Sequence, residues 1–149
     1  MRLIVIVLAV AALAREAKTA DVQSLTAAQV AEAIRNLSTT PPTNANLFSE
    51  ANYIVAIATV RHRIQPAEVH ENQDRVFYVI EGTGELRVGG QLRPAEQGST
   101  AQTKNSELEG YRSIPLSPGT VISVPRGRPY QFAAKHSEVS FLVVRVLGK

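Results

Sequence analysis

The chain has 149 residues, of which 44% are hydrophobic, which predicts one folded domain rather than a disordered tail. The formal net charge is +3, but the first twenty residues hold three of the 16 basic and one of the 13 acidic residues, leaving 13 basic and 12 acidic. A surface so nearly neutral excludes a nucleic-acid footprint. The absence of cysteine excludes disulfides, thiolate metal sites and a cysteine nucleophile.

The first twenty residues have the pattern of a secretory signal. Arg2 precedes an apolar run from Leu3 to Ala14, which is too short to cross a bilayer, where about 20 apolar residues are needed. A basic start, a short apolar region and small residues after it are typical of a signal peptide. We therefore expect residues 1–20 to be removed, leaving a periplasmic or secreted protein with no membrane contact. The alternative is an uncleaved strand or helix packed on the domain.

Residues 21–44 are predicted to be a helical lead-in and linker. The helix is expected over Ser24 to Leu37, because Thr26 and Gln29 have capping-box spacing and an apolar stripe follows at helical spacing. The stripe consists of Val30, Ile34 and Leu37. We expect it to pack on the rest of the domain or on a second subunit. Pro41 and Pro42 end the helical pattern.

Residues 45–149 are predicted to be an all-β body. Stretches rich in β-branched and aromatic residues predict the strands. They cover residues 53–63, 75–81, 85–88, 120–124 and 137–146. The Gly82-Thr83-Gly84 turn predicts that 75–81 and 85–88 pair as a β-hairpin. The polar stretch 91–113 predicts an irregular excursion with at most one short strand. Many short strands limited by turns indicate a sandwich or jelly roll.

Two segments carry a resemblance to the cupin superfamily. The second cupin motif, G-x5-P-x-G-x2-H-x3-N, is matched by Gly119, Pro125 and Gly127, with Tyr130 in the histidine position and Ala134 in the asparagine position. The resemblance covers roughly residues 50–147. It implies a cupin jelly-roll barrel with a short amino-terminal helix, and it also implies a homodimer.

The first cupin motif, G-x5-H-x-H-x3–4-E-x6-G, is matched more loosely. Gly82 sets the register, which places Glu68 and His70 at the two histidine positions and Arg75 at the glutamate position. Alternate strand residues face the same side. Glu68, His70 and Arg75 are therefore expected to point into the barrel, where Tyr130 approaches them.

The resemblance implies a divalent metal, because metal-dependent cupins hold iron, manganese, nickel or zinc with three imidazoles and a carboxylate. Here only His70 remains, and Arg75 keeps its positive charge at any working pH and repels a cation. We therefore expect no tight metal site. The alternative ligand set is Glu68, His70 and Asp74, which requires the strand to slip by one residue or to bulge.

Three functions remain open. In the first, His70 is the base and Tyr130 the acid of a metal-independent reaction, as the resemblance to dTDP-sugar epimerases implies. In the second, Glu68, Arg75 and Tyr130 bind a small ligand, expected to be an anion such as a sugar acid. The third is a metal-dependent oxygenase, isomerase or lyase. The sequence does not decide whether the protein is an enzyme.

Overall fold

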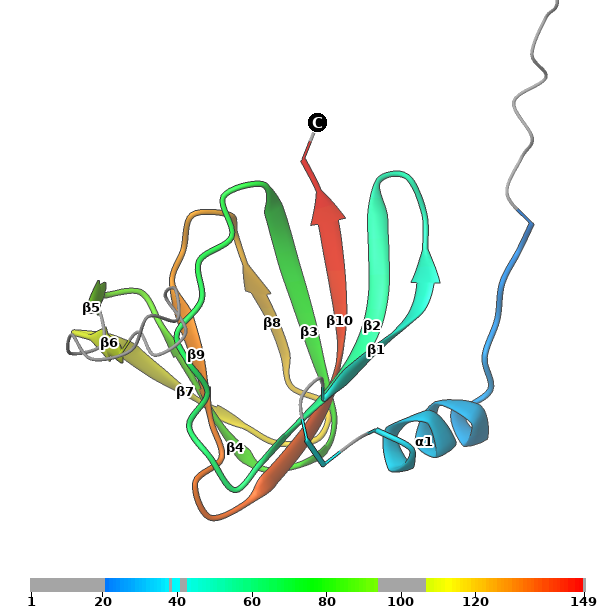
Figure 1. Ribbon diagram of the computed structural model, residues 1–149, viewed down its shortest axis with the longest axis horizontal. Coiled ribbons are helices and arrows are strands. Elements are labelled where there is room, and N and C mark those ends of the chain that lie inside the picture. The colour runs from blue at the N-terminus through cyan, green and yellow to red at the C-terminus, as the bar shows by residue number, and fades with distance from the viewer. Residues whose placement is uncertain (1–20, 38, 41–42, 94–106, 149) are drawn as a thin grey trace, which may run out of the picture.

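The computed structural model describes residues 21–37, 39–40, 43–93 and 107–148 (Figure 1). The predicted signal peptide lies outside these ranges, and no helix within them is long and apolar enough to cross a membrane. One helix and ten strands occur in the described residues. They are α1 (Ala27–Arg35), β1 (Asn44–Ser49), β2 (Tyr53–Arg61), β3 (Gln73–Gly82), β4 (Gly84–Val88), β5 (Gln91–Arg93), β6 (Glu107–Glu109), β7 (Arg112–Leu116), β8 (Val121–Val124), β9 (Tyr130–Ala133) and β10 (Glu138–Leu147).

Two antiparallel sheets form the body of the domain. The larger has the strand order β1-β2-β10-β3-β8 and the smaller has the order β7-β4-β9. Figure 1 shows them bent toward each other around a common interior. The core between them includes the fully buried Val60, Leu86 and Val139, one from each of β2, β4 and β10. This two-sheet arrangement is the all-β architecture that the short predicted strands require.

The predicted hairpin between β3 and β4 is wrong. β3 pairs with β10 and β8, whereas β4 pairs with β7 and β9, so the chain crosses from one sheet to the other between them. Gly82 makes this crossing with φ +80, and a Cβ there would lie 2.0 Å from the Glu138 carbonyl oxygen. The two glycines therefore form a corner between sheets, and a two-residue hairpin has the same sequence signal.

The predicted amino-terminal helix is present as α1, within the expected range Ser24 to Leu37. Thr26 is the N-cap of α1, its hydroxyl accepts from the Gln29 backbone N–H, and the Gln29 side chain completes the capping box. Ile34 and Leu37 are buried and pack with Ile57 on the outer side of the larger sheet. β1, which the sequence analysis did not predict, begins at Asn44 and pairs with β2 beside this contact.

The segment between β4 and β8 is more regular than predicted. β5 and β6 pair as a separate two-stranded sheet, and β7 joins the smaller sheet, where irregular chain with at most one short strand was expected. These strands are short and polar, so their alternation gives little signal in the sequence. Residues 94–106 of the predicted excursion lie outside the described residues.

The outer face of the larger sheet is apolar across neighbouring strands. The register places Val121, Tyr78, Leu142 and Ile57 in one row. The next row contains Ser123, Val76, Val144 and Val55. Tyr78 and Val121 are 46% and 64% exposed. The sheet thus has apolar side chains on both faces, although an antiparallel sheet with one solvated face usually alternates apolar and polar residues.

Candidate functional site

The four predicted site residues come together at the open end of the barrel interior. Tyr130 begins β9, and its backbone forms a two-way bridge with Glu68: Glu68 N–H donates to the Tyr130 carbonyl at 2.8 Å, and Tyr130 N–H donates back at 3.0 Å. The Gly127 N–H donates to the His70 carbonyl at 2.9 Å. Backbone contacts between the two motif segments therefore fix Glu68 and His70 beside Tyr130.

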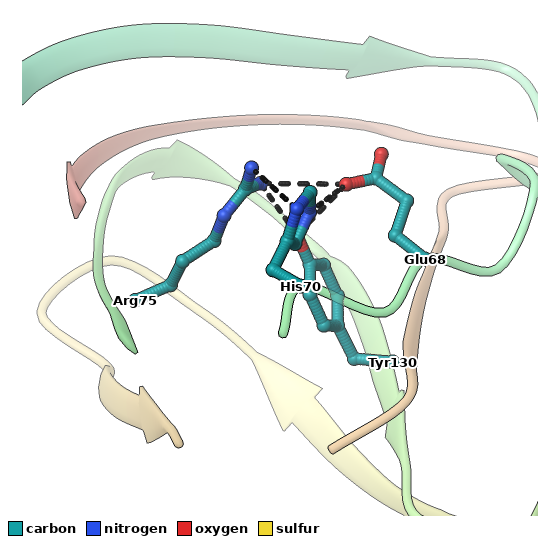
Figure 2. A network of polar contacts seen from close by, with 4 residues as sticks. All are labelled: Glu68, His70, Arg75 and Tyr130. Carbon is teal, nitrogen blue, oxygen red and sulfur yellow. Dashed lines mark hydrogen bonds and ion pairs between the residues drawn. The ribbon is translucent and has the colours of Figure 1, made fainter. Parts of the chain in front are cut away.

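One carboxylate oxygen of Glu68 is the centre of a polar network (Figure 2). This Oε2 accepts from the Tyr130 hydroxyl at 2.9 Å, lies 2.9 Å from His70 Nε2, and accepts from Arg75 Nη1 at 3.3 Å. Arg75 Nη1 also donates to the Tyr130 hydroxyl at 2.5 Å. The spacing of the two motifs thus correctly predicted that these four side chains meet.

The network contacts both ring nitrogens of His70. Arg75 Nη2 lies 3.4 Å from His70 Nδ1, and a guanidinium can only donate. Nδ1 is therefore the acceptor, and Nε2 carries the proton that His70 donates to Glu68. Both ring nitrogens of His70 are therefore engaged by neighbouring side chains.

Burial and charge shift the two oxygen acids in opposite directions. Burial raises the pKa of Tyr130 far above its ordinary value, and the neighbouring Glu68 charge adds to this effect. Burial alone would also raise the pKa of Glu68, but the hydrogen bonds from His70 and Tyr130 and the Arg75 charge together hold it below its ordinary value. At neutral pH the phenol is thus protonated beside an ionised carboxylate.

Arg145 is a further charged residue at this site that was not predicted from the sequence. It lies on β10, where Phe141 and Val143 point into the core, and its Cα is paired with that of Arg75 on β3. Burial lowers the pKa of Arg145, and the Arg75 charge lowers it further. Two-residue alternation along β10 was the available signal, because it places Arg145 on the same face as Phe141 and Val143.

The two arginines line a cavity of about 80 Å³. Glu68 and Tyr130 share its polar side, and aromatic side chains form an apolar wall. Phe132 and Phe141 stack with ring centroids 4.4 Å apart, and Phe77 meets both edge-on. The cavity therefore combines two cations and one carboxylate with an aromatic wall.

Sequence comparison finds no relative: no protein-family model and no curated protein matches the chain. The solved structures do match. Hydroquinone 1,2-dioxygenase from Sphingomonas sp. TTNP3, solved with 4-hydroxybenzoate, is 17% identical, with 79% of this chain and 72% of that chain covered and a TM-score of 0.58. A double-stranded β-helix protein of Klebsiella pneumoniae is 13% identical, with 77% and 86% covered and a TM-score of 0.55.

The protein TT1209 of Thermus thermophilus is 22% identical, with 77% of this chain and 94% of that chain covered and a TM-score of 0.53. The description of the Klebsiella structure names a double-stranded β-helix domain, and the resemblance seen in the two motifs is confirmed at the level of the fold. The protein has the cupin fold.

The metal ligands that the cupin resemblance implies are largely replaced in this domain. Among the described residues, no group of three His, Asp or Glu side chains could hold a metal ion. The slipped ligand set is wrong, because Asp74 points to the outer side of β3 and binds Arg126, with Arg126 Nη2 2.8 Å from Asp74 Oδ2. β3 keeps its register with β10 through Arg75, so no slip brings Asp74 inward.

The donor set that remains does not fit a divalent cation. Arg75 lies within hydrogen-bonding distance of both Glu68 and His70, so its positive charge occupies the place beside the two remaining ligand candidates. A cation there would be repelled in a partly buried site. The iron, manganese, nickel or zinc that the cupin resemblance implies therefore has no suitable ligand set in these residues.

Proposed function

We propose that this cupin binds a small organic anion in its barrel cavity. The observation that carries the proposal is the charge of the cavity wall, where Arg75 and Arg145 stand against the single carboxylate of Glu68. An anion between the two guanidiniums would gain charge-assisted hydrogen bonds, which are about twice as strong as neutral ones. Among the described residues, no second carboxylate lines this cavity.

Unused hydrogen-bond donors support the proposal. Three buried side-chain polar atoms lack a partner within the described ranges: Gln73 Oε1, Arg75 Nε and Arg145 Nε. A buried donor without a partner costs about 1–3 kcal/mol, so such atoms call for an explanation. A bound anion that accepts from the two arginine Nε atoms would remove this cost.

The acid–base alternative has weaker support from the geometry. Both nitrogens of His70 are engaged, and Tyr130 donates its proton to Glu68. In this arrangement no lone pair of the imidazole faces the cavity to take a proton from a substrate. The network therefore favours ligand binding by fixed charges over acid–base catalysis by His70 and Tyr130.

A thermal-shift series tests the proposal. Small carboxylates, added at constant ionic strength against a chloride reference, should raise the melting temperature of the protein. At about 100 times Kd the expected rise is on the order of 5–10 °C for a domain of this size. Arg75→Gln should abolish it, whereas Arg112→Met, which removes an exposed cation outside the cavity, should leave it intact. The absence of any rise with every anion contradicts the proposal.

We also propose that the protein is exported. The support is the amino-terminal pattern of residues 1–20 in the sequence. Mass spectrometry of the protein from the periplasm of an expressing bacterium should show a chain shortened by about this segment. A full-length chain confined to the cytoplasm contradicts export.

A further inference from the structure

We propose that the ligand is a short-chain monocarboxylate held between Arg75 and Arg145, with its alkyl end against the aromatic wall. The inference rests on the proposed anion-binding function and gives that function a ligand class. It also assigns a binding role to Arg145, which lies outside both sequence motifs.

The placement of the two arginines is the first argument. Their Cα atoms are directly paired across β3 and β10, and both side chains line the cavity. Like charges directly opposite each other on adjacent strands are destabilising. Arg75 is balanced by Glu68, but the Arg145 side chain makes no hydrogen bond or ion pair with any other described residue. An anion bound on the side of the cavity that Arg145 forms would balance its charge.

The charge and donor geometry select a monovalent carboxylate. Two guanidiniums and one carboxylate leave the cavity wall one positive charge in excess, which a single negative charge neutralises. A carboxylate has two oxygens that can each accept from a guanidinium. Arg75 uses its Nη atoms for Glu68, Tyr130 and His70, so its Nε remains for the ligand, as does the Nε of Arg145.

The size and the wall of the cavity limit the carbon chain. A single buried water needs about 10–15 Å³ of such space, so a cavity of about 80 Å³ has room for a ligand of roughly five to eight non-hydrogen atoms. Acetate and propionate are within this limit, whereas a sugar acid or an aromatic acid exceeds it. Phe77, Phe141 and Val143 line the same cavity and favour an alkyl group over a fully hydrated anion such as phosphate.

Calorimetric titration of the full chain with acetate, propionate, benzoate and inorganic phosphate tests the ligand class. Acetate or propionate should bind at least tenfold more tightly than benzoate and phosphate. Tighter binding of benzoate or phosphate would overturn the assignment of the class, while leaving the anion site itself in place.

Arg145→Met tests the role of Arg145. The variant keeps an unbranched, largely apolar side chain and removes the guanidinium, so propionate binding should weaken at least tenfold. The ligand-free variant should melt at a higher temperature than the wild type, because the repulsion from Arg75 is gone. A residue that only supports the fold would lower the melting temperature. Arg145→Gln provides a second uncharged variant should the first fail to fold, and Arg112→Met is the control for lost net charge.

The outcomes separate this inference from the proposed function. If no anion binds the wild type, both are wrong. If propionate binding is lost in Arg75→Gln but unchanged in Arg145→Met and Arg145→Gln, the anion site stands and the role of Arg145 is wrong. Loss of binding in both arginine variants, with a higher melting temperature for Arg145→Met, supports the inference.

Discussion

A single carboxylate oxygen organises the site. Glu68 Oε2 contacts three side chains at once, His70 and Arg75 from the first motif and Tyr130 from the second. Hydrogen bonds to a charged acceptor contribute about 1.5–3 kcal/mol each. The network therefore stabilises the fold at the same time as it fixes Arg75 for ligand binding.

Removal of the Tyr130 hydroxyl should destabilise the protein. In Tyr130→Phe, Glu68 loses one donor and Arg75 loses one acceptor, so the free energy of unfolding should fall by about 1–3 kcal/mol. Urea denaturation measures this change. Tyr53→Phe, which removes a hydroxyl from a side chain that is 38% exposed, should have almost no effect. Equal losses in the two variants contradict the role of the network.

The ion pair between Asp74 and Arg126 should make the free energy of unfolding depend on pH in the acid range. Hydrogen bonds from Arg126 lower the pKa of Asp74 from 3.8 to about 2. Because the pKa of Asp74 is lower in the folded than in the unfolded protein, the ionised carboxylate stabilises the fold at pH values above the unfolded pKa. This stabilisation is lost as the pH falls through the folded pKa. Asp74→Asn should therefore destabilise the protein at pH 6 and have little effect near pH 2. Urea titrations at both pH values test this; an equal loss at both contradicts it.

The site residues differ in how well the sequence predicted them. Glu68, His70, Arg75 and Tyr130 were found because glycines at fixed spacing set the register of two motifs. Arg145 was missed because it follows an apolar run in a strand without a motif. Its role depends on which strand lies beside β10, and this pairing is not encoded locally.

At the scale of elements, the corner at Gly82 decides the topology. The chain leaves the larger sheet at β3 and enters the smaller sheet at β4 within a few residues, and Thr83 N–H donates to the Glu138 carbonyl at 2.9 Å. The backbone of Gly82 fits closely against the start of β10. The sequence correctly predicted a turn at this point, but it did not predict which strands β3 and β4 pair with. The same glycine pattern is compatible with a hairpin and with a corner between two sheets.

Gly82→Ala should prevent stable folding, and Gly89→Ala is its matched control. Both glycines have positive φ, +80 and +75, but only Gly82 would place a Cβ against backbone atoms, whereas Gly89 has nothing within 4 Å among the described residues. Gly89→Ala should cost about 1–2 kcal/mol from its backbone conformation alone. Gly82→Ala should cost several kcal/mol more. Similar melting temperatures for the two variants contradict the corner contact.

At the scale of the whole molecule, the larger sheet is the least expected feature. The sequence predicted most of its strands by composition, but their order, β1-β2-β10-β3-β8, joins segments from both ends of the described chain. Only this order brings Tyr78, Leu142 and Val144 together into an apolar outer face. Helix α1 covers part of it at Ile57. The homodimer expected from the cupin resemblance stays a prediction.

The apolar outer face should control how the protein behaves on a hydrophobic surface. Val121→Lys introduces a charge beside Tyr78 on this face and should shorten retention on a hydrophobic-interaction column. Val22→Lys changes a residue that is 97% exposed and lies before α1, so its effect should be smaller. Both variants should keep a stability within about 0.5 kcal/mol of the wild type. Equal changes in retention contradict a continuous apolar face.

The buried Tyr130 can serve as an intrinsic spectroscopic probe of folding. The chain has four tyrosines and no tryptophan. Tyr130 is 2% exposed, whereas Tyr53, Tyr78 and Tyr111 are 38%, 46% and 38% exposed. Because burial raises the pKa of Tyr130, its phenolate absorbance should appear only at strongly alkaline pH. The buried, protonated phenol stabilises the folded state at lower pH, and this stabilisation is lost as the phenol ionises. Ultraviolet absorbance during an alkaline titration would thus report the opening of the barrel directly.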